Sequence, residues 1–187
     1  GKTAHSHKLA DWLRAQGRTV VQTREPGGTP GAEEIRKLLV QGDAARWDPM
    51  TEALLHFAAR RDHVVKVVKP ALASGAWVIS DRFVDSTMAY QGYGHGLGPE
   101  PIQLLRKLVL GEFAPGLTLL FDVPVALGLE RAGKRANTDA RYECMGEAFH
   151  ARVRDGFLAI ARAEPERIAT IDSSKPVPEV EGAIHAA

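Results

Sequence analysis

The chain has 187 residues, 44% of them hydrophobic and 25% charged, which is ordinary for one globular domain. Its net charge of +1 argues against a nucleic-acid coat protein or a polybasic membrane anchor, and no apolar run is long enough to predict a transmembrane helix. Because Cys144 is the single cysteine, it cannot form an intrachain disulfide; we expect a cytoplasmic protein in which this side chain only packs.

The first part of the chain predicts helices that alternate with one short strand. Apolar residues at helical spacing predict a helix over 4–16, and the β-branched run TVVQT predicts a strand over 19–23 that ends in the loop REPGGTPG. A second helix is expected over 32–40. A third, longer one is expected over 51–73, with a kink at Pro70.

The second part of the chain predicts three more strands. Residues 76–80, AWVIS, form the continuous apolar run of a strand that is buried on both faces. A helix near 100–111 precedes a second strand of this kind over 117–123. The remaining predicted elements are helices over 125–132 and 144–163, a strand over 168–172 and a helix from Pro178.

Strands that are separated by long helices predict an α/β fold, in which a parallel sheet forms the middle of three layers and helices cover both of its faces. We expect a single domain over residues 1–187. Ligands of such folds bind outside the carboxyl ends of the strands. Three polar clusters fall at these ends, namely REPGG after 19–23, DR after 76–80 and DVP at the end of 117–123.

Gly1, Lys2 and Thr3, followed directly by a helix, match the end of the phosphate-binding motif G-x-x-x-x-G-K-[ST]. In that motif backbone N–H groups and the lysine hold phosphates, and the hydroxyl binds Mg²⁺. The sequence is expected to start inside the motif, with the first strand and most of the glycine-rich loop absent from it. The alternative interpretation is a terminal lysine that is merely solvated.

Asp81 and Arg82 follow the strand over 76–80, where the presumed phosphates would arrive. A guanidinium can hold phosphate oxygens through two hydrogen bonds, and a carboxylate can bind Mg²⁺ through water or accept a proton from an attacking group. A structural salt bridge remains the alternative.

Two further patterns suit a nucleobase. His56 and Arg60 stand four residues apart on a predicted helix, so a flat ring and a guanidinium project from one face. Phe57 is expected in the core, and a core position for His56 also stays open. After DR, four polar side chains share one face of a predicted helix: Ser86, Thr87, Tyr90 and Gln91. The alternative interpretation of this face is an ordinary polar helix surface.

A short cationic stretch follows the helix over 125–132. It is poor in large apolar residues and carries one acid, Asp139, against four bases: Arg131, Lys134, Arg135 and Arg141. A solvated basic loop is the simplest interpretation, and a loop that closes over phosphates is the functional one.

Taken together, TREPGGT, DRFVDSTMAYQG and the initial GKT resemble bacterial thymidylate kinases, in order over essentially the whole chain. The resemblance implies a P-loop NTPase-type fold with a short mobile lid at 133–143. It also implies transfer of the γ-phosphoryl group of ATP to dTMP, giving dTDP, with Mg²⁺ and usually in a homodimer. ATP and dTMP are the expected partners, and binding to nucleic acid or to a membrane is not expected. The alternatives are a kinase for another nucleotide or deoxynucleoside, and a non-catalytic nucleotide-binding switch.

By this resemblance the catalytic set is Lys2, Asp81, Arg82, Arg131 and Arg135, and Mg²⁺ is assigned to Thr3 and Asp81. Family members with REPGGT typically carry their catalytic arginine in the lid, hence the choice of Arg131 and Arg135. ATP is assigned to Gly1, Lys2, Thr3, Arg135, Arg141, Lys175 and Val177.

The resemblance assigns dTMP to Glu25, Arg36, His56, Phe57, Arg60, Arg82, Ser86, Thr87, Tyr90 and Gln91. His56 stands where the family usually has a phenylalanine that stacks on thymine, which leaves open whether His56 or Phe57 stacks. Tyr90 is expected to exclude a ribose 2′-hydroxyl, and Gln91 to pair with the thymine edge.

Overall fold

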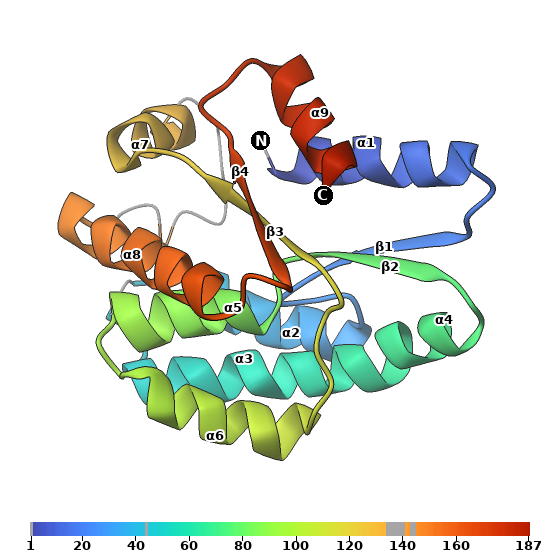
Figure 1. The fold of residues 1–187 in the computed structure, drawn as a ribbon. Coiled ribbons are helices and arrows are strands. Elements are labelled where there is room, and N and C mark those ends of the chain that lie inside the picture. Colours follow the sequence, from blue (N-terminus) through green and yellow to red (C-terminus); the bar gives the residue numbers. More distant parts are fainter. Residues whose placement is uncertain (1, 44, 134–140, 143–144) are drawn as a thin grey trace.

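The computed structural model describes residues 2–43, 45–133, 141–142 and 145–187 (Figure 1). The assignments to Gly1, Arg135 and Cys144, and most of the expected lid, lie outside the described residues. No helix in the described ranges is long and apolar enough to cross a membrane.

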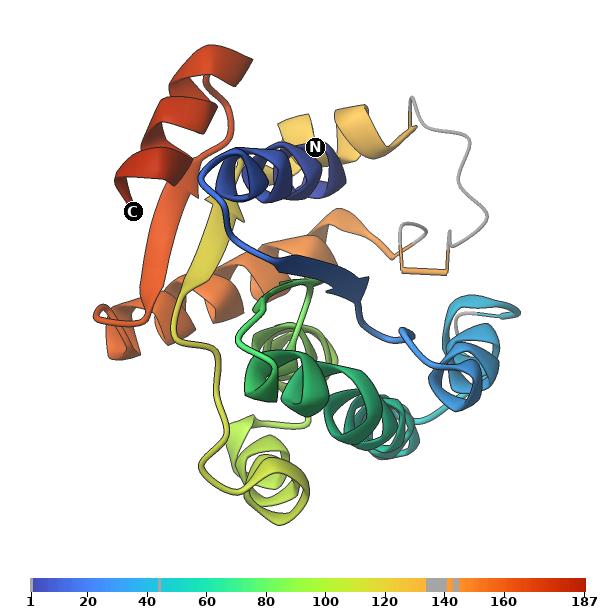
Figure 2. The same cartoon turned by 90° about the vertical axis from the view of Figure 1, so that its right-hand side faces the viewer.

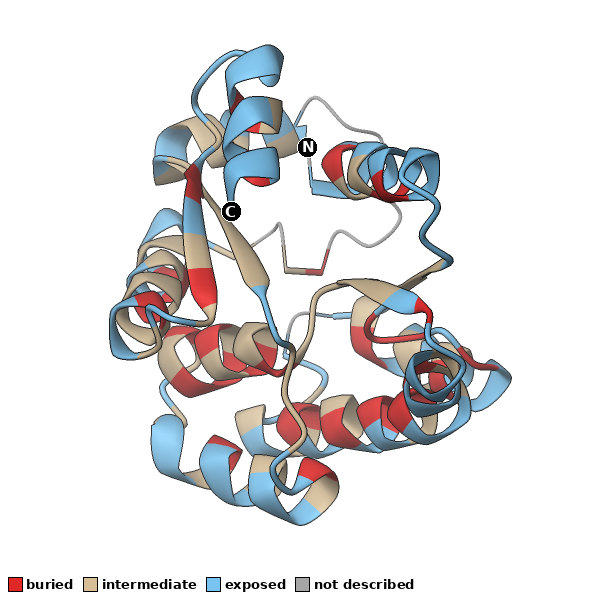
Figure 3. Ribbon diagram, turned by 45° about the vertical axis from the view of Figure 1, so that its right-hand side comes forward, coloured by how far each residue is buried: buried red, intermediate tan, exposed pale blue. Residues whose placement is uncertain are grey.

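The described strands are all parallel, as predicted, and they form two pairs. β1 (Val20–Arg24) pairs with β2 (Trp77–Asp81), and β3 (Thr118–Asp122) pairs with β4 (Ile168–Asp172). The expected single sheet is therefore divided. The two pairs stand apart in Figure 3, and a cavity lined by residues of β1, β2 and β3 lies between them. Strands joined by hydrogen bonds lie only about 4.8 Å apart, so the pairs do not bond to each other across this cavity.

Helices lie on both sides of the strands, which confirms the three-layer α/β prediction (Figures 1 and 2). On one side are α1 (Lys2–Ala15), α7 (Val125–Gly133) and α9 (Val177–Ala186). The other side holds α2 (Pro30–Val40), α3 (Pro49–His63), η1 (Val64–Val68), α4 (Lys69–Ala73), α5 (Val84–Thr87), η2 (Met88–Gly94), α6 (Pro99–Leu110) and α8 (Glu147–Ala163).

Side-chain caps fix where α2 and α3 begin. The Thr29 hydroxyl accepts a hydrogen bond from the backbone N–H of Ala32, and Pro30 occupies the first turn, where a missing N–H costs nothing. Asp48 caps α3 in the same way, by accepting from the N–H groups of Met50 and Thr51. α2 and α3 lie against each other on the same side of the strands (Figure 1).

The long helix predicted over 51–73 is interrupted before Pro70 and not at it. Residues 64–68 form a π-helical turn, η1, in which the N–H of Lys69 bonds to the carbonyl of Val64. Pro70 then lies in the first turn of α4, where no N–H is needed. Apolar spacing alone cannot distinguish this widened turn from a regular helix.

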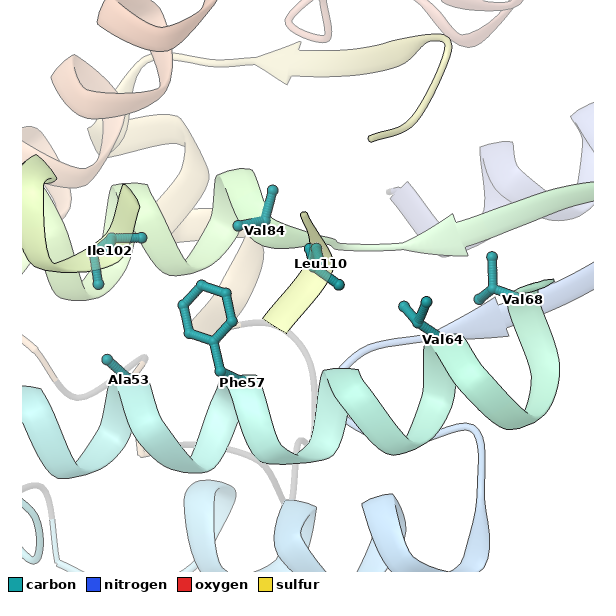
Figure 4. Close-up of a cluster of buried hydrophobic side chains, with 7 residues drawn as sticks. All are labelled: Ala53, Phe57, Val64, Val68, Val84, Ile102 and Leu110. Atoms are coloured by element: carbon teal, nitrogen blue, oxygen red, sulfur yellow. The ribbon is translucent and has the colours of Figure 1, made fainter. Parts of the chain in front are cut away.

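The main core cluster lies between the α3–η1 ridge and the segment that follows β2. Phe57, Val64 and Val68 of the ridge face Val84 of α5 and the α6 residues, as Figure 4 shows. Burial of these side chains fixes α5 against α3. The polar residues at the end of β2 are thereby held beside those on α3.

α8 packs closely against η2 because Gly156 carries no side chain. A Cβ at this position would lie 2.7 Å from Cγ of Tyr93. The two elements therefore meet with a tyrosine ring against a helix backbone.

We expect the substitution Gly156→Ala to destabilise the protein by about 1–3 kcal/mol, because the added methyl group overlaps the Tyr93 ring. Gly182→Ala is the matched control, since Gly182 also lies within a helix but has no atom within 4 Å of the added Cβ. Helix propensity alone should stabilise this control by up to about 1 kcal/mol. Urea unfolding followed by circular dichroism measures both, and equal effects would contradict the close packing.

Candidate active site

A cavity of about 1280 Å³ lies at the carboxyl ends of the strands. Its wall includes Arg24, Asp81 and Asp122, the last residues of β1, β2 and β3. It brings together twelve residues assigned from the sequence: Lys2, Thr3, Glu25, Arg36, His56, Arg60, Asp81, Arg82, Ser86, Thr87, Tyr90 and Gln91.

A buried ion pair joins the loop after β1 to α3. Arg60 Nε donates to Glu25 Oε2 at 2.6 Å, and both side chains are 2% exposed. The other carboxylate oxygen of Glu25 lies 3.0 Å from His63 Nδ1, while His63 Nε2 lies 2.7 Å from the Thr23 hydroxyl. Gly28 belongs to the same loop and has a φ of +89°; a Cβ there would lie 2.5 Å from the His63 ring.

This pairing leaves one donor of Arg60 unused. Its Nη2 donates to the Thr87 hydroxyl at 3.1 Å, whereas its Nη1 is buried and has no hydrogen-bond partner among the described residues. Gln91, one turn after Thr87, is 1% exposed, and its Oε1 also lacks a partner within the described chain. Buried polar groups normally have partners, so an unpaired donor and an unpaired acceptor in a cavity wall indicate a ligand with the complementary pair.

His56 faces the cavity and Phe57 does not. His56 lines the cavity wall with its Nε2 3.4 Å from the Tyr142 hydroxyl oxygen, while Phe57 is 1% exposed in the main core cluster. Burial lowers the pKa of His56 to about 3, and the positive charges of Arg60 and Arg82 act in the same direction. The ring is therefore neutral at physiological pH, and of the two residues His56 is the one that lines the cavity.

Arg82 is held in an uncommon backbone conformation. Its φ is +74°, and it is the one non-glycine residue in the described chain with positive φ. Its guanidinium lies 3.4 Å from both the Ser86 and the Tyr90 hydroxyl oxygens and 5.0 Å from the centroid of the Tyr90 ring. Interaction with Tyr90 raises the pKa of Arg82 despite its burial. The side chain is thus a positioned, permanently charged donor in the cavity wall.

The two residues assigned to Mg²⁺ are neighbours. The Thr3 hydroxyl, in the first turn of α1, donates to Asp81 Oδ2 at the end of β2, at 3.1 Å. A hydroxyl and a carboxylate supply the oxygen ligands that Mg²⁺ prefers. The described residues contain no group of three His, Cys, Asp or Glu side chains that could hold a metal by themselves. Phosphate oxygens and water would therefore have to complete any coordination sphere here.

Four residues assigned from the sequence to catalysis or ATP lie outside the cavity wall. Arg131 Nη1 donates to the carbonyl of Ser173 at 2.8 Å, and Lys175 and Val177 lie just after β4. Arg141 is buried, with hydrogen bonds to the carbonyls of Leu39 and Asp43 and an ion pair with a buried acid, Glu52. The structure therefore places Arg141 between α2 and α3 and does not bring it to the expected phosphates.

Sequence reasoning missed Glu52 and Tyr142. Glu52 is 0% exposed and accepts hydrogen bonds from Gln91 Nε2 at 3.0 Å and from the Tyr142 hydroxyl at 3.1 Å. One signal was available, because an acid one turn before His56 shares its helix face within the apolar stretch EALLHF. Tyr142 gave no such signal. The Arg154–Asp122 pair in the cavity wall, with contacts of 2.8 and 2.9 Å, was also missed.

Comparison with known proteins gives consistent results. The family model described as Thymidylate kinase matches residues 1–184. A thymidylate kinase of Caulobacter vibrioides is 52% identical over 184 residues, covering 98% of this chain and 88% of the relative. One from Pseudomonas fluorescens is 50% identical over 186 residues, covering 100% and 88%. The crystal structure of thymidylate kinase from Ehrlichia chaffeensis superposes with a TM-score of 0.78 at 37% identity, covering 100% of this chain and 90% of that one.

We expect the His56 imidazole to stay neutral from pH 8 down to pH 5. Its folded pKa of about 3 lies below the ordinary value of 6.5, so the unfolded chain binds a proton that the folded chain does not. The stabilising contribution of the neutral ring is complete above pH 6.5 and is lost as the pH falls toward 3. The ¹H–¹³C NMR shifts of the ring, assigned with a His56→Gln variant, measure this directly. A midpoint above pH 5 would contradict it.

Proposed function

Since this chain belongs to the thymidylate kinase family, whose members phosphorylate dTMP to dTDP with ATP, we propose that its cavity holds dTMP and the phosphates of ATP together. The chain is an ATP-dependent dTMP kinase of α/β fold. The roles of individual residues, the bound metal, the oligomeric state and the cellular location are proposals.

The unpaired groups of Arg60 and Gln91 carry the placement of the base. Thymine presents a carbonyl oxygen, O4, directly beside an N–H, N3. A buried donor, Arg60 Nη1, and a buried acceptor, Gln91 Oε1, offer the complementary pair. We place the thymine edge against these two groups and the neutral His56 ring against its face. Thr87 and Glu25 then act indirectly, since both hold the Arg60 guanidinium.

The cationic groups of the cavity wall suit the single phosphate of dTMP and the phosphate chain of ATP. We place the 5′-phosphate of dTMP between Arg82 and Arg36, and the phosphates of ATP at Lys2, which begins α1. Tyr90 contacts the Arg82 guanidinium with both its ring face and its hydroxyl. We also assign Tyr90 to the sugar of dTMP. With both anions fixed, the reaction needs chiefly alignment and neutralisation of charge.

Mg²⁺ is proposed at Thr3 and Asp81, which both line the cavity and are joined by a hydrogen bond. When bound, the ion would neutralise charge on the phosphates. Thr3 and Asp81 orient one another through their 3.1 Å hydrogen bond, and Asp81 is held at the end of β2 by its pairing with Arg24. The catalytic roles of Arg131 and Arg135 remain proposals of the same kind.

We further propose a homodimer formed through an apolar stripe on α3, η1, α4 and α6. Leu54, Val65 and Leu72 follow one another at helical spacing and are exposed, and on α6 Leu104 is 64% and Leu108 82% exposed. The Arg61 side chain bonds to the carbonyl of Val109, which ties the two helices into one face (Figure 1). Exposed leucines clustered on one face indicate a protein partner, and a second copy supplies an equal stripe.

A cytoplasmic location completes the proposal, because the single cysteine excludes an intrachain disulfide.

We expect Arg82→Ala to lower kcat by at least about 100-fold, because it removes a charge-assisted contact to a phosphate in the transition state. Steady-state ADP release with ATP, Mg²⁺ and dTMP measures the effect. The fold should persist, since alanine has the same Cβ as arginine at this positive φ. Arg18→Ala, an exposed arginine outside the cavity wall, is the control and should retain kcat. An unchanged kcat in Arg82→Ala would refute the role.

We expect Leu108→Glu to convert the dimer to monomers, since it buries a charge within the proposed stripe. Light scattering coupled to gel filtration gives the mass of each species. Leu117→Glu is the matched control, because Leu117 is also exposed but precedes β3, away from the stripe. A wild-type chain that runs as a monomer would remove the proposal, as would equal dissociation by both variants.

A further inference from the structure

We propose that Glu52 is a positioning residue that sets which end of the Gln91 amide faces the cavity, and thereby selects thymine over cytosine. This inference rests on the proposed placement of the base beside Arg60 and Gln91. It concerns a buried acid that has no role in the phosphate or base contacts described above. Glu52 is connected to the base-binding groups through one hydrogen bond, which it accepts from Gln91 Nε2.

The partners of Glu52 make it an acceptor. Its Oε1 forms an ion pair with Arg141, whose side chain is as fully buried as its own. A carboxylate that is paired with a guanidinium stays ionised and has no hydrogen to donate. Gln91 lies 3.0 Å away on the side of Oε2, so the end of the amide that faces Glu52 must be Nε2.

The second N–H of Gln91 is used as well. Gln91 Nε2 lies 3.4 Å from the Tyr142 hydroxyl oxygen, and that hydroxyl gives its own hydrogen to Glu52 Oε2 at 3.1 Å. Burial, together with the charge of Glu52, raises the pKa of Tyr142, so the hydroxyl keeps this hydrogen. Tyr142 can then only accept from Gln91. Two acceptors thus hold the nitrogen end of the amide, and Oε1 is the end left without a partner in the described chain.

The orientation of the amide decides which pyrimidine fits. Thymine offers a donor at N3 beside a carbonyl, which suits Gln91 Oε1 and Arg60 Nη1. Cytosine has the reverse pattern, an acceptor at N3 beside an amino group. Its N3 would face the acceptor Gln91 Oε1, and its amino group would face the donor Arg60 Nη1. A flipped Gln91 would present N–H groups, one of which would donate to the N3 of cytosine. Uracil has the same imide edge as thymine, so Glu52 should not discriminate between dTMP and dUMP.

The variant Glu52→Gln tests this directly. Arg141 should draw the new amide oxygen toward itself, which turns the new amide nitrogen, a donor, toward Gln91. Gln91 would then flip and show Nε2 to the cavity. We expect the ratio of Kd for dCMP to Kd for dTMP to fall by roughly 10- to 100-fold in titration calorimetry, and the ratio of the two kcat/KM values to fall with it. The ratio for dTMP and dUMP should stay within about twofold of the wild type.

Tyr142→Phe is the matched control, because it removes one partner of Glu52 and leaves the carboxylate facing Gln91. It should keep the wild-type ratio of dCMP to dTMP. A purely structural role of Glu52 would weaken all three nucleotides equally and leave every ratio unchanged, and this result would overturn the proposal. An equal loss of selectivity in Tyr142→Phe would also overturn it.

Two further variants keep the outcome interpretable. If Glu52→Gln shows no cooperative unfolding transition, the double variant Glu52→Gln/Arg141→Gln leaves no buried charge unpaired. Without the Glu52 carboxylate nothing fixes the Gln91 amide in one orientation, so the selectivity of the double variant should also fall. Gln91→Leu tests the base placement itself. Unchanged dTMP affinity in Gln91→Leu would remove the placement, whereas weakened affinity there with unaltered selectivity in the Glu52 variants would remove only the role of Glu52.

Discussion

The site depends on the ion pair between Glu25 and Arg60. Two charges removed from water are costly unless their remaining hydrogen-bonding groups are satisfied. His63 satisfies the second oxygen of Glu25, and the Thr87 hydroxyl satisfies a second nitrogen of Arg60. The loop after β1, the helix α3 and the segment after β2 meet at this pair. Among the described residues, Arg60 Nη1 is the one group of this pair without a partner, so the pair both fixes the cavity wall and leaves it one donor for a ligand.

The sequence predicted the parts of the fold and of the site whose causes are local. Runs such as AWVIS predict strands because four of the five residues are apolar, and DR stands at the end of this run. Since the carboxyl ends of parallel strands share one edge, most of the assigned residues could be expected in one place, and twelve of them line one cavity. The resemblance to thymidylate kinases supplied the individual roles, which the shared cavity alone does not establish.

Other features depend on contacts between distant residues, which no local pattern encodes. Glu52 meets Tyr142 across 90 positions and Arg141 across 89, so neither partner could be inferred from its neighbours in the chain. The choice between His56 and Phe57 also depends on packing. The widened turn before Pro70 escaped detection because π- and α-helical spacing of apolar residues are alike over one turn.

The backbone of Arg82 has a consequence for how this chain can evolve. A side chain at φ of +74° costs the folded state on the order of 1 kcal/mol that glycine would not. Selection for heat resistance alone would therefore favour losing the guanidinium at this position. Populations under such selection should readily reach stable but inactive variants, so an arginine at this position is a compromise between stability and turnover.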